Sequence, residues 1–188
     1  RAAFERAVSL LASAGARISE IDIAHADVVA AIYLQIVFSE AAAYHAATLE
    51  SMPGQYSPAV RLRLEMARYV LAEDYLRAMT GRAALRREVD AALASHDSLI
   101  LPTLPITAPV IGEPMATIDG APHPVRNVML RLTQLFNITG HPAVSLPCGV
   151  TAEGLPIGLQ LVGRRHETDA LMRVALGVEG AMSRGAPH

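Results

Sequence analysis

Apolar positions recur at helical spacing over the opening of the chain. They lie three and four residues apart, at Phe4, Ala7, Val8, Leu11 and Ala14. Gly15 follows them and predicts the end of this helix, because glycine readily adopts the backbone conformation that closes helices. Residues 24–49 are rich in alanine and contain neither Gly nor Pro, so we predict a second helix that ends before Met52, Pro53 and Gly54.

A third helical pattern begins at Ser57 and Pro58, a serine suited to capping a helix followed by a proline at the first helical position. The pattern can continue through Gly81 toward Leu93, since one glycine costs only about 1 kcal/mol in a helix. Two later helices are predicted over residues 125–138, closed by Gly140, and from a cap at Thr168 or Asp169 onward.

Strands are predicted by four short apolar runs, at residues 18–23, 98–101, 143–146 and 157–162. The last two flank a glycine-containing turn at residues 151–154, which predicts a hairpin or a pair of adjacent strands. Between residues 102 and 124, six prolines exclude regular helix and predict a long ordered loop.

These elements predict an α/β fold in which strands of mixed direction are covered by helices. The length of 188 residues suits one domain, which we place over residues 1–188. Helix dominates the pattern, and four short strands are few for so much helix. The sequence therefore predicts an incomplete sheet.

The charge balance excludes some functions. The formal net charge of −2 supplies no clustered positive charge for nucleic acid, so a small molecule or a protein is the expected partner. All 16 basic residues are arginine, which excludes a lysine base within this chain. The single cysteine, Cys148, cannot form an internal disulfide. The start of the chain does not resemble a signal peptide, and no uncharged apolar run could cross a bilayer, so we expect a cytoplasmic protein without a membrane partner.

Residues that could carry chemistry give weak signals. The seven histidines never pair at the close spacings of zinc motifs, so we predict no metal site. A nucleophile pair of Cys148 and His141 is conceivable, but a small buried residue at a strand end is the favoured interpretation of the cysteine. Ser145 does not fit a nucleophile elbow, because Ala143 and Pro147 stand where that motif needs glycines.

Charged side chains of the third helix have equally ordinary explanations. Glu65 and Glu73 lie among arginines and fit ion pairs on a helix surface. Arg61 and Arg63 point to different sides of the helix, so at most one could bind an anionic carboxylate through its guanidinium. Solvated helix surface is the favoured interpretation of both.

Two sequence blocks near the end of the chain are more specific. The first reads Gly-His-Pro-Ala-Val-Ser-Leu-Pro-Cys-Gly over residues 140–149, and the second reads Gly-Leu-Pro-Ile-Gly-Leu-Gln-Leu-Val-Gly over residues 154–163. Together they closely resemble the C-terminal block of the amidase-signature family. Upstream, Asp-Ser-Leu-Ile-Leu-Pro-Thr-Leu-Pro at residues 97–105 resembles the family's strand and Pro-Thr turn. The resemblance spans essentially the whole chain.

The resemblance implies both a fold and an activity. The fold would be the C-terminal part of the amidase-signature fold, a mixed central sheet covered by helices. The activity would be cofactor-free hydrolysis of a carboxamide to a carboxylate and ammonia or an amine, by a Ser, cis-Ser, Lys triad. In the family, the lysine and a Gly- and Ser-rich stretch lie in the N-terminal half, and this chain has neither. We therefore expect the missing N-terminal half of a parent amidase to supply catalysis, and the chain alone to be inactive.

By the same resemblance, four polar residues are expected nearest the amide substrate, namely Arg63, Thr103, Thr133 and Asn137, although Thr and Asn also cap turns and helices. In the glutamine-dependent amidotransferases of the family, the amidase-like chain carries an acidic residue seven positions before Asn137. Leu130 stands there, which argues against recognition of free glutamine and favours a broad or apolar amide.

Two other interpretations stay open. One is a non-catalytic binding module that reuses the fold. The other is a protein like the amidase-like chain of an amidotransferase, with protein partners and a tRNA-linked substrate. A part of a larger enzyme should expose a large apolar patch where the remainder docks, whereas a free-standing module should not. Assembly into a homo-oligomer is also open.

Overall fold

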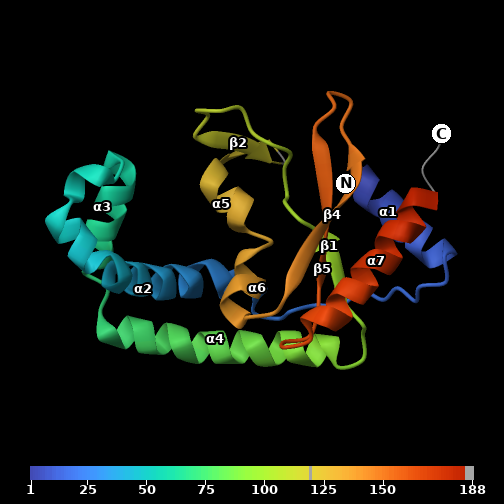
Figure 1. Ribbon diagram of the computed structural model, residues 1–188, viewed down its shortest axis with the longest axis horizontal. Coiled ribbons are helices and arrows are strands. Elements are labelled where there is room, and N and C mark those ends of the chain that lie inside the picture. The colour runs from blue at the N-terminus through green and yellow to red at the C-terminus, as the bar shows by residue number, and fades with distance from the viewer. Residues whose placement is uncertain (119, 185–188) are drawn as a thin grey trace. The chain divides into compact units, whose positions relative to one another are not determined.

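The computed structural model describes residues 1–118 and 120–184, and Figure 1 shows its helices and strands. The chain divides into two compact units. The sheet unit consists of residues 1–23 and the chain from residue 88 onward, and the helical unit consists of residues 24–87. The boundary lies within helix α4 (Ala72–Leu93). The expectation of one domain over residues 1–188 stays a prediction.

A three-stranded sheet organises the sheet unit. It contains β1 (Leu99–Pro102), β4 (Ala143–Val150) and β5 (Pro156–Val162), in the order β1-β5-β4. Both pairings are antiparallel, and no parallel pair of strands occurs among the described residues. The predicted hairpin of β4 and β5 is confirmed, and its turn contains Gly154 at a φ of 82°.

One face of this sheet forms a hydrophobic core. Alternate residues of β5, Leu159 and Leu161, are fully buried together with Ala7, Leu171 and Ala175. The latter three come from α1 (Ala2–Ser13) and α7 (Thr168–Arg184), which lie on the same side of the sheet in Figure 1. Burial of each leucine stabilises the fold by about 1.5–3 kcal/mol. Both helices were predicted from the apolar spacing and are confirmed.

The opposite face of the sheet lies toward α5 (Val125–Leu130) and α6 (Gln134–Thr139). The sequence predicted one helix over residues 125–138, but residues 131–133 interrupt it. The end of α6 at Gly140 is confirmed, and this glycine has a left-handed φ of 76° that other residues adopt at a cost.

Two predictions of strand and loop were wrong. The predicted loop over residues 102–124 contains an antiparallel hairpin of β2 (Met115–Ile118) and β3 (Ala121–Pro124). Prolines are tolerated in β3 because each strand of a two-stranded ladder has an edge that forms no ladder bonds. Residues 16–23 form no strand, and no described strand pairs with them. Apolar alternation alone could not show that a pairing partner is missing there.

The helical unit contains η1 (Ala26–Val28), α2 (Val29–Ser51), η2 (Pro53–Gln55), α3 (Pro58–Ala67) and the first part of α4. The predicted start at Pro58 is confirmed, but α3 ends at Ala67 and residues 68–71 separate it from α4. Gly81 allows α4 to approach α2 closely, because a Cβ at this position would stand 2.7 Å from Ile32 Cδ1.

One helical segment, Ala26–Ser51, is long and apolar enough to cross a membrane, and only 11% of its most apolar window is buried. The sequence contains no uncharged apolar run that is long enough to cross a bilayer. This segment does not meet that criterion because it contains the charged residue Glu40. Length and composition are weak evidence for a membrane span, because helices in the interior of soluble proteins have the same properties.

Candidate functional site

The hydroxyl groups of Thr103 and Ser145 form a pair on the three-stranded sheet, close to the C-terminal end of β1. Thr103 directly follows β1, and its backbone N–H donates to the carbonyl oxygen of Gly158 on β5 at 2.9 Å. Its Oγ1 lies 2.6 Å from Oγ of Ser145 on β4. A Cβ added at Gly158 would stand 2.6 Å from the first oxygen and 2.7 Å from the second. The two hydroxyls therefore occupy the space that a side chain at residue 158 would need.

Two other residues expected near the substrate lie one helical turn apart. Thr133 precedes the first residue of α6, and the Asn137 N–H donates to its carbonyl oxygen at 3.2 Å. Asn137 is exposed, so its amide is accessible. Thr133 is half-buried, and its hydroxyl donates to the carbonyl oxygen of Leu130 at 3.2 Å. The Thr133 hydroxyl therefore stabilises the local turn.

Gln160 connects the start of α6 to the sheet. Its side-chain amide donates to the carbonyl oxygen of Leu132 at 3.1 Å. Gln160 and Gly158 are two residues apart on β5 and thus face the same side of the sheet, about 7 Å apart. Thr103, which is bonded to Gly158, and Leu132, which is bonded to Gln160, therefore lie on the same face of the sheet. The remaining predicted residue, Arg63, belongs to the helical unit, where it is exposed on α3.

An ionic cluster anchors the end of α4 beside this face. Arg165 binds the Asp90 carboxylate through two hydrogen bonds, from Nε to Oδ1 at 3.1 Å and from Nη2 to Oδ2 at 2.9 Å. These hydrogen bonds hold the pKa of Asp90 below its usual range. The buried side chain of His141 lies with Nε2 3.2 Å from Asp90 Oδ1 and with Nδ1 2.8 Å from Thr139 Oγ1. The turn that leads from α6 into β4 is thereby fixed to α4.

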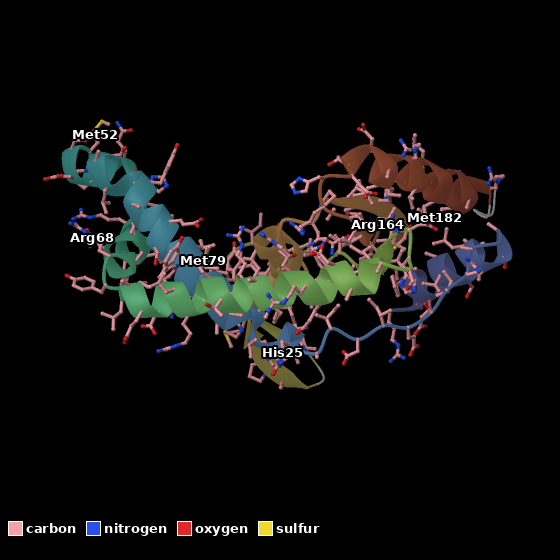
Figure 2. All side chains as sticks on the ribbon, turned by 90° about the horizontal axis from the view of Figure 1, so that it is seen from below. His25, Met52, Arg68, Met79, Arg164 and Met182 are labelled. Atoms are coloured by element: carbon pink, nitrogen blue, oxygen red, sulfur yellow. The ribbon has the colours of Figure 1, made fainter. Side chains whose placement is uncertain are left out.

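The adjacent arginine, Arg164, binds the backbone at the same helix end (Figure 2). It donates to the carbonyl oxygens of Leu93 at 3.1 Å and His96 at 2.8 Å. Such contacts satisfy carbonyl groups that the end of a helix leaves without helical partners. The sequence prediction missed both arginines as anchors. Arg165 and Asp90 are 75 positions apart, and no local pattern marks them as partners.

The conceivable nucleophile pair of Cys148 and His141 receives no support. Both ring nitrogens of His141 lie within hydrogen-bonding distance of other groups, as described above. Cys148 is half-buried and packs against the core cluster on the α1 and α7 side of β4. Burial raises the pKa of its thiol, which disfavours the nucleophilic thiolate.

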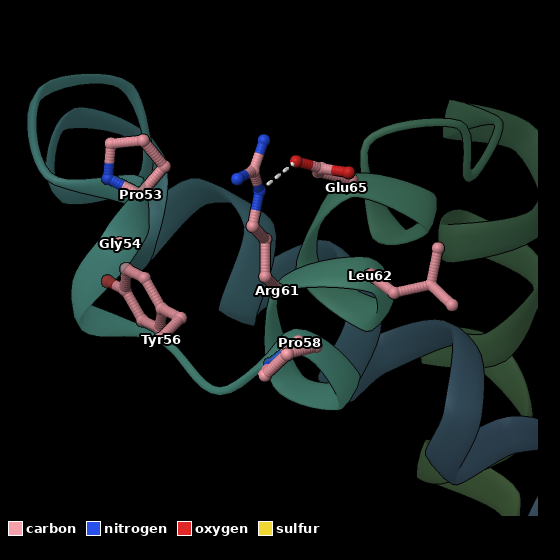
Figure 3. Close-up of a pocket in the computed structure, with 7 residues that line it drawn as sticks. All are labelled: Pro53, Gly54, Tyr56, Pro58, Arg61, Leu62 and Glu65. Carbon is pink, nitrogen blue, oxygen red and sulfur yellow. Dashed lines mark hydrogen bonds and ion pairs between the residues drawn. The ribbon is translucent and has the colours of Figure 1, made fainter.

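Two surface hollows are lined by none of the four predicted site residues. One, of about 490 Å³, is lined by Pro53, Gly54, Tyr56, Pro58, Arg61, Leu62 and Glu65 (Figure 3). Arg61 Nε is paired there with Glu65 Oε1 at 2.7 Å, as expected for a helix-surface ion pair. The other, of about 500 Å³, follows α1. Within residues 1–118 and 120–184, no group of three or more His, Cys, Asp or Glu side chains could hold a metal ion.

Comparison with known proteins explains the arrangement of sheet and helices. The family model described as Amidase matches residues 1–172. This chain belongs to the amidase family. Its fold is that of the C-terminal portion of an amidase-signature enzyme, because a crystal structure of an amidase superposes on 98% of the chain with a TM-score of 0.86 and 31% identity. The chain covers 41% of that structure.

Other relatives agree with this assignment. An amidase of Pseudomonas putida is 34% identical over 180 residues, which cover 95% of this chain and 38% of that protein. The A component of the glutamyl-tRNA(Gln) amidotransferase of Picosynechococcus sp. is 38% identical over 125 residues, 64% of this chain and 25% of that protein. The structure of 6-aminohexanoate cyclic dimer hydrolase complexed with substrate has a TM-score of 0.79 and 26% identity, over 96% of this chain and 41% of that one. The chain thus spans about two fifths or less of the length of these family members.

Proposed function

We propose that this chain is the C-terminal part of an amidase that hydrolyses carboxamides to a carboxylate and ammonia or an amine. The observation that carries the proposal is the match of the Amidase family model to residues 1–172. The chain contains no lysine, so the Ser, cis-Ser, Lys triad would come from the remainder of the parent protein. There, lysine would act as base through the bridging serine, and backbone N–H groups would stabilise the oxyanion.

In this proposal the chain supplies a wall of the substrate pocket. Thr103 and Asn137 offer hydroxyl and amide groups that are at least partly exposed. Thr133 would act mainly by stabilising the turn before α6, because its hydroxyl donates a hydrogen bond to the carbonyl oxygen of Leu130. The exposed guanidinium of Arg63 would suit an anionic group on the substrate.

The surface of α2 supports the proposal that further chain packs on this one. The helix is apolar over most of its length, yet only Val29, Ile36 and Leu49 are buried. A helix that is hydrophobic on all sides is normally covered. Leu34 and Tyr44 of this helix are 39% and 84% exposed. An uncovered surface of this kind favours a part of a larger enzyme over a free-standing binding module.

The decisive experiment compares the 188-residue chain with the product of the longest reading frame that contains it. Both would be assayed by release of ammonia or amine from simple aryl and aliphatic amides, and their intact masses would be measured. We expect the longer product to contain the lysine and serines and to turn over, while the chain alone does not. If the longest product equals this chain and nothing is hydrolysed, the binding-module interpretation replaces the proposal.

A second candidate function has one observation in its favour, the 38% identity to the A component of an amidotransferase. Leu130 argues against it, because an apolar side chain at this position offers no group for the α-amino group of free glutamine. Glutamine should therefore be a poor substrate for the longer product. Turnover of glutamine at least as fast as that of apolar amides would favour the amidotransferase assignment.

A further inference from the structure

We propose that Ser145 is a positioning residue for Thr103, and that Gly158 is required to leave space for their hydrogen bond. In this arrangement Ser145 fixes the direction of the Thr103 hydroxyl, which binds the amide group of the substrate. The inference rests on the proposed amidase function, since it assigns a role within the same pocket.

The geometry joins two strands that are not neighbours. β5 lies between β1 and β4, so the side chains of Thr103, directly after β1, and Ser145, within β4, must reach across it to meet. The 2.6 Å separation between the hydroxyl oxygens of Thr103 and Ser145 shows that they do. Their contact passes directly over Gly158, the residue of β5 that lacks a side chain. Any larger residue there would push the hydroxyls apart.

The backbone of Thr103 is fixed independently of this contact. Its N–H bond to Gly158 extends the pairing of β1 with β5 by one residue. The peptide position of Thr103 is therefore set by the sheet, and only the rotation of its side chain is left for Ser145 to determine. For this reason, loss of the serine hydroxyl should change the direction of the threonine hydroxyl more than the position of its backbone.

The chemistry of the pair suits an amide ligand. Each hydroxyl has one proton and two acceptor lone pairs. When the Ser145 hydroxyl donates to Thr103 Oγ1, the Thr103 proton remains available for a ligand carbonyl oxygen. The Thr103 oxygen then keeps one lone pair that can accept from a ligand N–H, so this hydroxyl offers both groups that a carboxamide requires. Thr103 is partly exposed, so a ligand can reach it.

The test uses the amide-hydrolysing protein that contains this chain, with Ser145→Ala, Thr103→Val and the double variant. Each single variant should raise KM by about fivefold with little change in kcat, a factor typical of losing one hydrogen bond between neutral groups. The double variant should be no worse than Thr103→Val, because Ser145 acts through Thr103. Ser145→Thr keeps a hydroxyl and should restore the native KM.

A matched control separates positioning from stability. Thr151 Oγ1 accepts a hydrogen bond from the Leu155 N–H within the turn of the same β4–β5 hairpin. Thr151→Val removes that bond away from the hydroxyl pair, so it should lower the melting temperature without changing KM. An unchanged KM in Ser145→Ala, or fully additive effects of Ser145→Ala and Thr103→Val, would overturn the inference.

A measurement without substrate distinguishes failure of this inference from failure of the proposed function. Three-bond NMR couplings report the χ1 rotamer of Thr103, which should be single in the native protein and averaged in Ser145→Ala. A single unchanged rotamer in the variant refutes the positioning role whatever the activity. Absence of amide hydrolysis by the native long product refutes the proposed function, and with it the substrate contact of Thr103.

Discussion

Replacing Gly158 by alanine should destabilise the fold although alanine is ordinarily the better residue in a strand. The added Cβ would stand 2.6 Å from Thr103 Oγ1, 2.7 Å from Ser145 Oγ and 3.1 Å from Thr103 Cβ. Thr103 cannot withdraw freely, because its backbone is bonded to residue 158 itself. Overpacking of this kind costs about 1–3 kcal/mol. Separation of the hydroxyls adds about 1 kcal/mol.

The lower backbone entropy of alanine in the unfolded chain offsets about 0.5–1 kcal/mol of this cost. We therefore expect Gly158→Ala to lower the free energy of unfolding by roughly 1–3.5 kcal/mol. Gly177→Ala is the matched control. Gly177 lies inside α7 with nothing within 4 Å of the position of an added Cβ. That variant should gain about 0.5–1 kcal/mol, because glycine is a poor helix former.

Guanidinium chloride denaturation followed by circular dichroism would measure both variants. The two midpoints should shift in opposite directions from the native midpoint, with similar slopes. Gly158→Ala at or above native stability, alongside a stabilised Gly177→Ala, would refute the steric role of Gly158. Combining Gly158→Ala with Ser145→Ala should also cost less than the sum of the two changes, because the serine oxygen no longer meets the new methyl group.

Three further predictions concern the core, the ionic cluster and the cysteine. Leu161→Ala should lower the free energy of unfolding by about 2–5 kcal/mol because its side chain is fully buried, whereas Leu176→Ala at a 66% exposed position should stay within about 0.5 kcal/mol in the same denaturation assay. The hydrogen bonds from Arg165 lower the folded-state pKa of Asp90. The stabilisation by Asp90 should therefore be complete above the ordinary carboxyl pKa of about 4, and it should be lost as the pH falls through the lower pKa of the folded state. Asp90→Asn should reduce this acid sensitivity between neutral and acidic pH, and identical pH profiles of stability would contradict the role of the pair. Cys148 should react more slowly with a thiol reagent at about pH 8 in the native protein than in denaturant, because burial raises its pKa; equal rates would contradict this.

The sequence by itself determined the features that depend on local patterns. Apolar spacing located α1 and α7, an alanine-rich run without Gly or Pro located α2, and Gly140 marked the end of α6. Apolar runs around a glycine-containing turn located the hairpin of β4 and β5. The motif blocks at residues 140–149 and 154–163 indicated the amidase-signature family, which the family model over residues 1–172 confirms. The roles of the four predicted site residues stay predictions.

Tertiary structure decided what depends on partners distant in sequence. Residues 18–23 have strand-like alternation but form no strand, because a strand exists only where another strand supplies backbone hydrogen bonds. Ser145 failed as a nucleophile by motif spacing, and its contact with Thr103, 42 positions away, appears only once β5 places both side chains over Gly158. The spacing of apolar residues along the chain shows which face of a helix or strand is apolar. It does not show which elements pack side by side, and the contact of Ser145 with Thr103 depends on that packing.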